Sequence, residues 1–222
     1  ALNGGYIIAY IDEKNLDIIN QDLGFSFTSS ESVVLGLLGR EALVSSGIAQ
    51  VHTPNLNLRG KGVVLGIVDT GIDYTQNAFR YEDGTTRIIS IYDQTIRGDY
   101  PFNYFVGTEY TREQINRALM TNNPLSVVPS TDTVGHGTFL ASIAAGSENE
   151  ELTGAAPEAE IVVVKLKKAR NYYINKYLVP PEQENVYESS AVMVGIDYII
   201  RKAQQLGRPA AICIGLGTNI GG

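Results

Sequence analysis

The chain has 222 residues, of which 44% are hydrophobic, a size that suits one domain, or one domain with a small appendage. Seventeen basic and 24 acidic residues give a formal net charge of −7, and no basic stripe is present, so nucleic acid is not an expected partner. The apolar runs are too short to cross a bilayer, so no membrane is expected, and the single cysteine, Cys213, excludes an intrachain disulfide.

The N-terminal quarter of the chain has no regular alternation of strands and helices. Residues 5–11 (GYIIAYI) predict a strand, and residues 13–24 (EKNLDIINQDLG) predict a short amphipathic helix that ends at a glycine. Residues 30–47 are mixed in character. Residues 51–62 (VHTPNLNLRGKG) have the Pro, Asn and Gly content of a surface connection.

From residue 62 onward, predicted strands alternate with predicted helices. The strands are 62–69 (GVVLGIVD), 87–93, 160–166 and 209–217, and the helices are 111–120, 137–146 and 188–207. Thr111 is the expected cap of its helix, with Glu113 close behind, and residues 171–188 look like an inserted surface loop. This order predicts an α/β fold with a mostly parallel sheet flanked by helices.

Two residues in this frame could carry chemistry. Asp69 stands at the carboxyl end of a strand, where open α/β sheets place active groups, although an isolated Asp-Thr-Gly more often only caps a turn. His136 begins a helix and is expected beside Leu140 and Ile143 on the buried face. A lone histidine at such a place is more often a satisfied core residue than a base.

The pair is more informative than either residue alone. A carboxylate that ends a strand and an imidazole that begins a helix can meet above the sheet, so that Asp69 accepts a hydrogen bond from one ring N–H of His136. The other ring nitrogen is then free to act as a base. Gly135 and Gly137 flank the histidine, and we expect them to leave room for an approaching substrate.

Four segments resemble the subtilisin-like serine proteases. Residues 60–73 (GKGVVLGIVDTGID) and 135–146 (GHGTFLASIAAG) are similar to the Asp and His motifs of that family, with Asp before His in the chain. Residues 154–166 and 209–219 resemble its later strands. Further stretches such as LNLRGKG and TEYTREQINRAL are closer still to the clostridial germination-protease (Csp-like) branch, and the resemblance spans residues 45–222.

The resemblance implies a role for five residues. Asp69 would orient the imidazole and His136 would be the general base. Gly215, Leu216 and Gly217 would form the substrate-binding edge, to which an extended peptide or protein substrate adds as a strand.

Three further polar residues near these motifs are expected to have no chemical role. Thr138 is predicted to be structural, and Asp73 and Asp132 are predicted to be solvated loop carboxylates. The chemistry needs no cofactor, and no carboxylate-rich loop predicts a metal site.

The resemblance also predicts the domain organisation. Residues 1–44 would be a small α+β propeptide-like segment, and residues 45–222 the N-terminal part of a truncated catalytic domain. The family's Gly-Thr-Ser-x-Ala segment and its oxyanion-hole asparagine segment do not occur in this sequence. We therefore expect a longer protease whose C-terminal part supplies both, and an inert chain when that part is missing. The alternative to such a C-terminal part is an oligomer that covers the exposed sheet edge.

Two other functions compete with this interpretation. A pseudoprotease would bind a partner through the same sheet edge without turnover. A nucleotide-binding α/β domain is disfavoured, because the glycines of GKGVVLG precede the strand instead of following it. A reduced-looking cysteine and no visible export signal weakly favour a cytoplasmic or spore-associated location.

Overall fold

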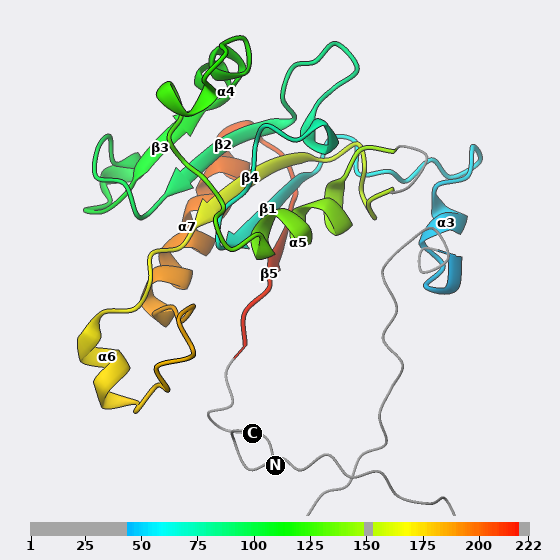
Figure 1. Cartoon of the computed structure of the whole chain (residues 1–222). Coiled ribbons are helices and arrows are strands. Elements are labelled where there is room, and N and C mark those ends of the chain that lie inside the picture. Colours follow the sequence, from blue (N-terminus) through cyan, green and yellow to red (C-terminus); the bar gives the residue numbers. More distant parts are fainter. Residues whose placement is uncertain (1–43, 149–152, 218–222) are drawn as a thin grey trace, which may run out of the picture. The chain divides into compact units, whose positions relative to one another are not determined.

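The computed structural model describes residues 44–148 and 153–217 (Figure 1). The strand predicted at 5–11, the helix predicted at 13–24 and all but the last residue of the propeptide-like segment lie outside the described residues.

A five-stranded sheet forms the centre of the described part. Its order is β3-β2-β4-β1-β5, and the strands are β1 (Val64–Asp69), β2 (Ile88–Asp93), β3 (Thr108–Thr111), β4 (Glu160–Lys165) and β5 (Ala210–Ile214). Strands β2, β4, β1 and β5 run parallel, and only β3 is antiparallel to its neighbour β2. The mostly parallel α/β sheet predicted from the sequence is therefore confirmed. The short strand β3 was not predicted.

The helices predicted at 111–120, 137–146 and 188–207 are present, and the described residues also contain two short helices that were not predicted. The helices are α3 (Ile48–Val51), α4 (Arg112–Leu119), α5 (His136–Ala145), α6 (Asn171–Lys176) and α7 (Ser189–Leu206), and none of the described helices is long and apolar enough to span a membrane. The connections within the described residues contain the short 3₁₀ helices η3 (Asn77–Phe79), η4 (Pro101–Asn103) and η5 (Pro124–Ser126).

Local chemistry explains two of these elements. Thr111 caps α4 as predicted, but Gln114, not Glu113, closes the capping box by accepting a hydrogen bond from the Thr111 N–H. The predicted loop at 171–188 contains α6, which was missed. An isolated antiparallel β-bridge between Lys168 and Tyr187 joins the two ends of this loop.

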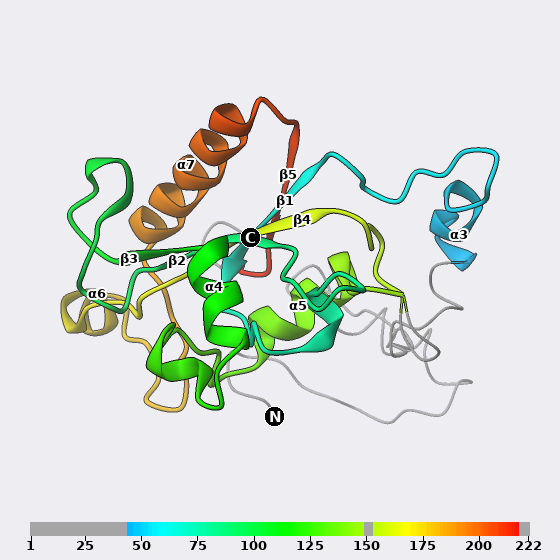
Figure 2. The same cartoon turned by 90° about the horizontal axis from the view of Figure 1, so that it is seen from above.

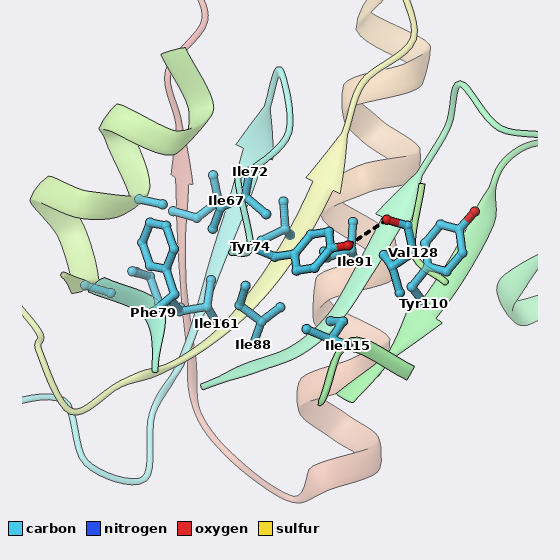
Figure 3. Packing of buried hydrophobic residues seen from close by; sticks show 14 of the residues in the cluster. Ile67, Ile72, Tyr74, Phe79, Ile88, Ile91, Tyr110, Ile115, Val128 and Ile161 are labelled. Atoms are coloured by element: carbon cyan, nitrogen blue, oxygen red, sulfur yellow. Dashed lines mark hydrogen bonds between the residues drawn. The ribbon is translucent and has the colours of Figure 1, made fainter. Parts of the chain in front are cut away.

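Helices cover both faces of the sheet, with α7 on one side and α4 and α5 on the other (Figure 2). Successive residues of β1 alternate between the two faces. Leu65 and Ile67 join the cluster on the α5 side, whereas Val64 and Val68 join the cluster on the α7 side. Figure 3 shows the α5-side cluster, in which the Tyr74 hydroxyl donates to the Val128 carbonyl. By the same alternation, Asp69 is on the α5 side.

On the α7 face, one buried hydrogen bond joins helix to sheet. The Tyr198 hydroxyl donates to Ser90 Oγ at 2.7 Å, and both residues are buried. We expect Tyr198→Phe to lower the free energy of unfolding by about 1–2 kcal/mol, because Ser90 would keep a buried hydroxyl without this partner. Chemical denaturation measures the effect. Tyr172→Phe on the exposed helix α6 is the control and should leave stability unchanged. Equal stabilities for the two variants would contradict the expectation.

Candidate active site

Asp69 is the last residue of β1 and is fully buried. It lies beside β4, where Lys165 is its register partner, and beside the end of β5. Its Oδ1 atom accepts a hydrogen bond from the Thr70 N–H at 2.7 Å. Oδ2 is buried without a hydrogen-bond partner among the described residues. The strand end thus holds a carboxylate in one orientation at the face where α5 begins.

His136 is the first residue of α5, and its Nδ1 atom lies 2.8 Å from Asp69 Oδ1. An ionised carboxylate can only accept a hydrogen bond, so Nδ1 is the donor in this contact, and in a neutral imidazole Nε2 is then the acceptor. No described residue is hydrogen-bonded to Nε2. The structure therefore brings together the two residues that the sequence paired across 67 positions.

The environment of His136 differs from the one expected. Its side chain is 49% exposed, so it is not a core histidine. The buried residues of α5 are Gly137, Ala141 and Ala145. The buried face of the helix is therefore not centred on the face that carries His136 and Leu140. The imidazole consequently lies at the margin of the helix–sheet contact, where a reactant can reach it.

The flanking glycines also serve a purpose that was not predicted. A Cβ atom on Gly137 would lie 2.2 Å from the Gly71 carbonyl oxygen, so this glycine lets α5 pack directly on the turn after β1. Gly135 adopts a left-handed conformation with φ of 84°, which favours glycine whatever the space around it. That these glycines leave room for a substrate stays a prediction.

Gly215 leaves space for the side chains of Asp69 and His136 themselves. A Cβ atom at this position would lie 2.6 Å from Asp69 Oδ2 and 2.8 Å from His136 Cε1. A side chain here would displace the pair. Of the other residues predicted at the substrate edge, Leu216 packs partly buried against the α7-side cluster and Gly217 is exposed. All three directly follow β5, and Gly215 lies beside the Asp–His pair.

Asp132 is not the solvated loop carboxylate that was expected. It is half-buried, and its Oδ1 atom accepts from Thr70 Oγ1 at 2.8 Å and from the Gly135 N–H at 2.9 Å. Its Oδ2 atom accepts from the N–H of Thr138 at 2.8 Å and from its hydroxyl at 2.7 Å. Burial alone would raise the pKa of Asp132, but the hydrogen bonds from Thr138, Thr70 and Gly135 outweigh burial and lower it.

Asp73 is a simpler case. Its side chain accepts hydrogen bonds from Thr75 and Gln76 within its own loop. Only its backbone N–H reaches the helix, where it donates to Thr138 Oγ1 at 2.9 Å. Thr138 thus joins the loop to the helix, which is the structural role predicted for it. Within 44–148 and 153–217, no group of three or more His, Cys, Asp or Glu residues could hold a metal ion.

The sequence profile of the subtilase family matches residues 60–178, more than half of the chain, and this range includes both Asp69 and His136. The chain belongs to the subtilase family. No curated protein matches the chain.

A solved structure extends this likeness. The CspB protease of Clostridium perfringens is similar to the chain, with a TM-score of 0.67 and 33% sequence identity. The similarity covers 82% of this chain and 34% of the CspB chain, so the chain spans about a third of the length of that protein. The predicted resemblance to the subtilase family and its Csp-like branch is confirmed.

Proposed function

We propose that the chain carries the aspartate and the histidine of a serine endopeptidase whose serine lies outside this sequence. The observation that carries the proposal is the 2.8 Å contact between His136 Nδ1 and Asp69 Oδ1, with Nε2 on a half-exposed ring. Membership of the subtilase family supports the same reaction class.

In the proposed reaction, His136 moves one proton twice. Its Nε2 atom takes the proton of the serine hydroxyl as the serine oxygen attacks the peptide carbonyl, and then gives that proton to the leaving amine. Water later hydrolyses the acyl-enzyme by the same exchange. The carboxylate of Asp69 stabilises the imidazolium that forms in each half of the reaction.

The proposed substrate is a peptide or protein segment in extended conformation. Residues 215–217 follow β5, which is an edge strand of the described sheet, and Gly215 lies beside the Asp–His pair. An added strand at this edge would place its carbonyl groups near His136. We propose that the C-terminal part of a longer protease completes this edge and supplies the serine and the oxyanion asparagine. An oligomer is the alternative means of covering the edge.

The test compares the 222-residue chain with the full-length protein that contains it. Each is incubated with a serine-directed phosphonate and analysed by intact mass, and peptide hydrolysis is measured in parallel. We expect one phosphonate adduct and turnover in the full-length protein, and neither in the 222-residue chain. A folded full-length protein without adduct or turnover would instead indicate a binding module. Phosphonate-sensitive hydrolysis by the short chain would place the nucleophile within this sequence.

A further inference from the structure

The start of α5 lacks a side-chain cap of the usual kind. The residue before the helix is Gly135, which has no side-chain oxygen to accept from the free N–H groups of the first turn. Asp132, three residues earlier, takes that role by accepting from the N–H groups of Gly135 and Thr138. A carboxylate at this end also interacts favourably with the helix dipole.

The same carboxylate reaches the other half of the site. Thr70, which directly follows Asp69, donates its hydroxyl to Asp132 Oδ1 and accepts from the Gly137 N–H at 2.9 Å. Thr70 is next to Asp69 in the chain, and the other residues bonded to Asp132 or Thr70 are next to His136 or one position further along α5, namely Gly135, Gly137 and Thr138. The hydrogen bonds form a continuous path from the end of β1 to the first turn of the histidine helix.

The segment that carries Asp132 is itself anchored to the sheet. Ser130 Oγ donates to Asp93 Oδ2 at 2.6 Å, and Lys165 Nζ donates to the Thr131 carbonyl at 2.6 Å. Asp93 and Lys165 are the last residues of β2 and β4, and Asp93 is fully buried. Asp132 thus rests on the ends of two further strands, so its position is fixed independently of α5.

We infer that Asp132 is a positioning residue that holds the imidazole of His136 against Asp69 through Thr70 and the first turn of α5. The inference rests on the proposed function, because it assigns the position of the proposed base. Asp132 touches neither ring nitrogen and has no role in proton transfer. Its effect is to fix the backbone on both sides of the pair.

Replacement of Asp132 by asparagine tests this role with little change in size. Asp132 uses both oxygens as acceptors of backbone N–H groups, Oδ1 for Gly135 and Oδ2 for Thr138. An asparagine has one oxygen and one NH₂ group. In either orientation of the amide, its NH₂ group faces one of these N–H groups, so one end of the network must open.

The experiment uses the full-length protein with Asp132→Asn, and Asp73→Asn as the matched control. Asp73 is a half-buried carboxylate near the same helix, but its side chain bonds only within its loop. Two quantities are measured: kcat and KM on a peptide substrate, and the low-field proton NMR signal of the His136 Nδ1–H. We expect Asp132→Asn to lower kcat about 10- to 100-fold with KM unchanged, and to shift or remove the signal. Asp73→Asn should match the wild type in both.

Thr70 offers a second test should Asp132→Asn fail to fold. Thr70→Val removes the hydroxyl that links Asp132 to Gly137, whereas Thr70→Ser retains it. We expect the valine variant to behave as described for Asp132→Asn and the serine variant to keep the wild-type kcat and signal. Identical kcat and signal in the two Thr70 variants would overturn the inference.

Failure of the inference and failure of the proposed function give different results. An Asp132→Asn variant that melts earlier but keeps wild-type kcat and Nδ1–H signal would show that Asp132 only stabilises the fold, and would overturn the inference. A wild-type protein without turnover would defeat the proposed endopeptidase. The NMR comparison of Asp132→Asn with Asp73→Asn would still decide the role of Asp132 in that case.

Discussion

Replacing His136 with alanine in the full-length protein is expected to lower kcat by about 10⁶-fold, and replacing Asp69 with alanine by about 10⁴-fold. His136 loses more because without it no group removes the serine proton. Without Asp69, the imidazole is present but has lost its acceptor, the Oδ1 atom that lies 2.8 Å from Nδ1. Because the two residues act as a unit, the double variant should fall no further than His136→Ala.

The control for this prediction is Asp73→Ala, which removes a nearby half-buried carboxylate without touching the pair. It should keep kcat within the range of the wild type. All variants are first compared by circular dichroism and thermal melting, so that loss of fold is separated from loss of chemistry. Losses that multiply in the double variant would contradict the assignment of Asp69 and His136 to one unit.

Gly137→Ala is expected to destabilise the protein by about 3 kcal/mol and to lower kcat at least about 100-fold. The added Cβ would lie 2.2 Å from the Gly71 carbonyl oxygen and 3.2 Å from Asp69 Cβ. A backbone carbonyl cannot turn aside as a flexible side chain can, so α5 must move away from β1. That movement separates His136 from Asp69.

The expected loss of stability in Gly137→Ala is opposite in sign to the usual effect of this substitution in a helix. Within a helix, Gly→Ala ordinarily stabilises by about 1 kcal/mol, because alanine restricts the unfolded chain and favours helix. Gly135→Ala is the comparison: it adds the same methyl group into open space and costs only backbone strain of about 1–2 kcal/mol. Thermal melts and kcat should rank Gly137→Ala well below Gly135→Ala. A stabilised, active Gly137→Ala variant would show that α5 does not pack on the turn after β1.

Much of the fold could be predicted from hydrophobic patterning. Strand β1 is a continuous apolar run because both of its faces are covered, and α7 has an amphipathic pattern over 18 residues. The contact between Asp69 and His136 was also predictable, because the carboxyl end of a parallel strand such as β1 and the start of a helix that leads back to another parallel strand, here α5 before β4, lie at the same edge of a sheet.

What the sequence did not reveal depends on contacts between distant residues. Strand β3 has only four residues, and it exists because β2 pairs with it. Asp132 looked like a loop residue, since its partner Thr70 lies 62 positions away. A signal was present, however: an aspartate lies three residues before a glycine at a helix start, where a cap is needed.

The purpose of each glycine was equally hidden. Gly135, Gly137 and Gly215 look alike in the sequence, yet one adopts a left-handed conformation, one permits a backbone contact and one clears the Asp–His pair. The roles of Gly137 and Gly215 are set by atoms of residues distant in the sequence, such as Gly71 and Asp69, whereas that of Gly135 is set by its backbone conformation. Only the packed structure distinguishes them.

The most direct measurement is the protonation state of the two His136 ring nitrogens, read by NMR on protein labelled with ¹⁵N in histidine. Only one other histidine, His52, is present in this sequence, and its Nε2 atom instead lies 2.9 Å from the Ala155 carbonyl. The proposed pair predicts a low-field His136 proton on Nδ1 that disappears in Asp69→Ala. A proton on Nε2 alone, or an Nδ1 signal unaffected by Asp69→Ala, would contradict it.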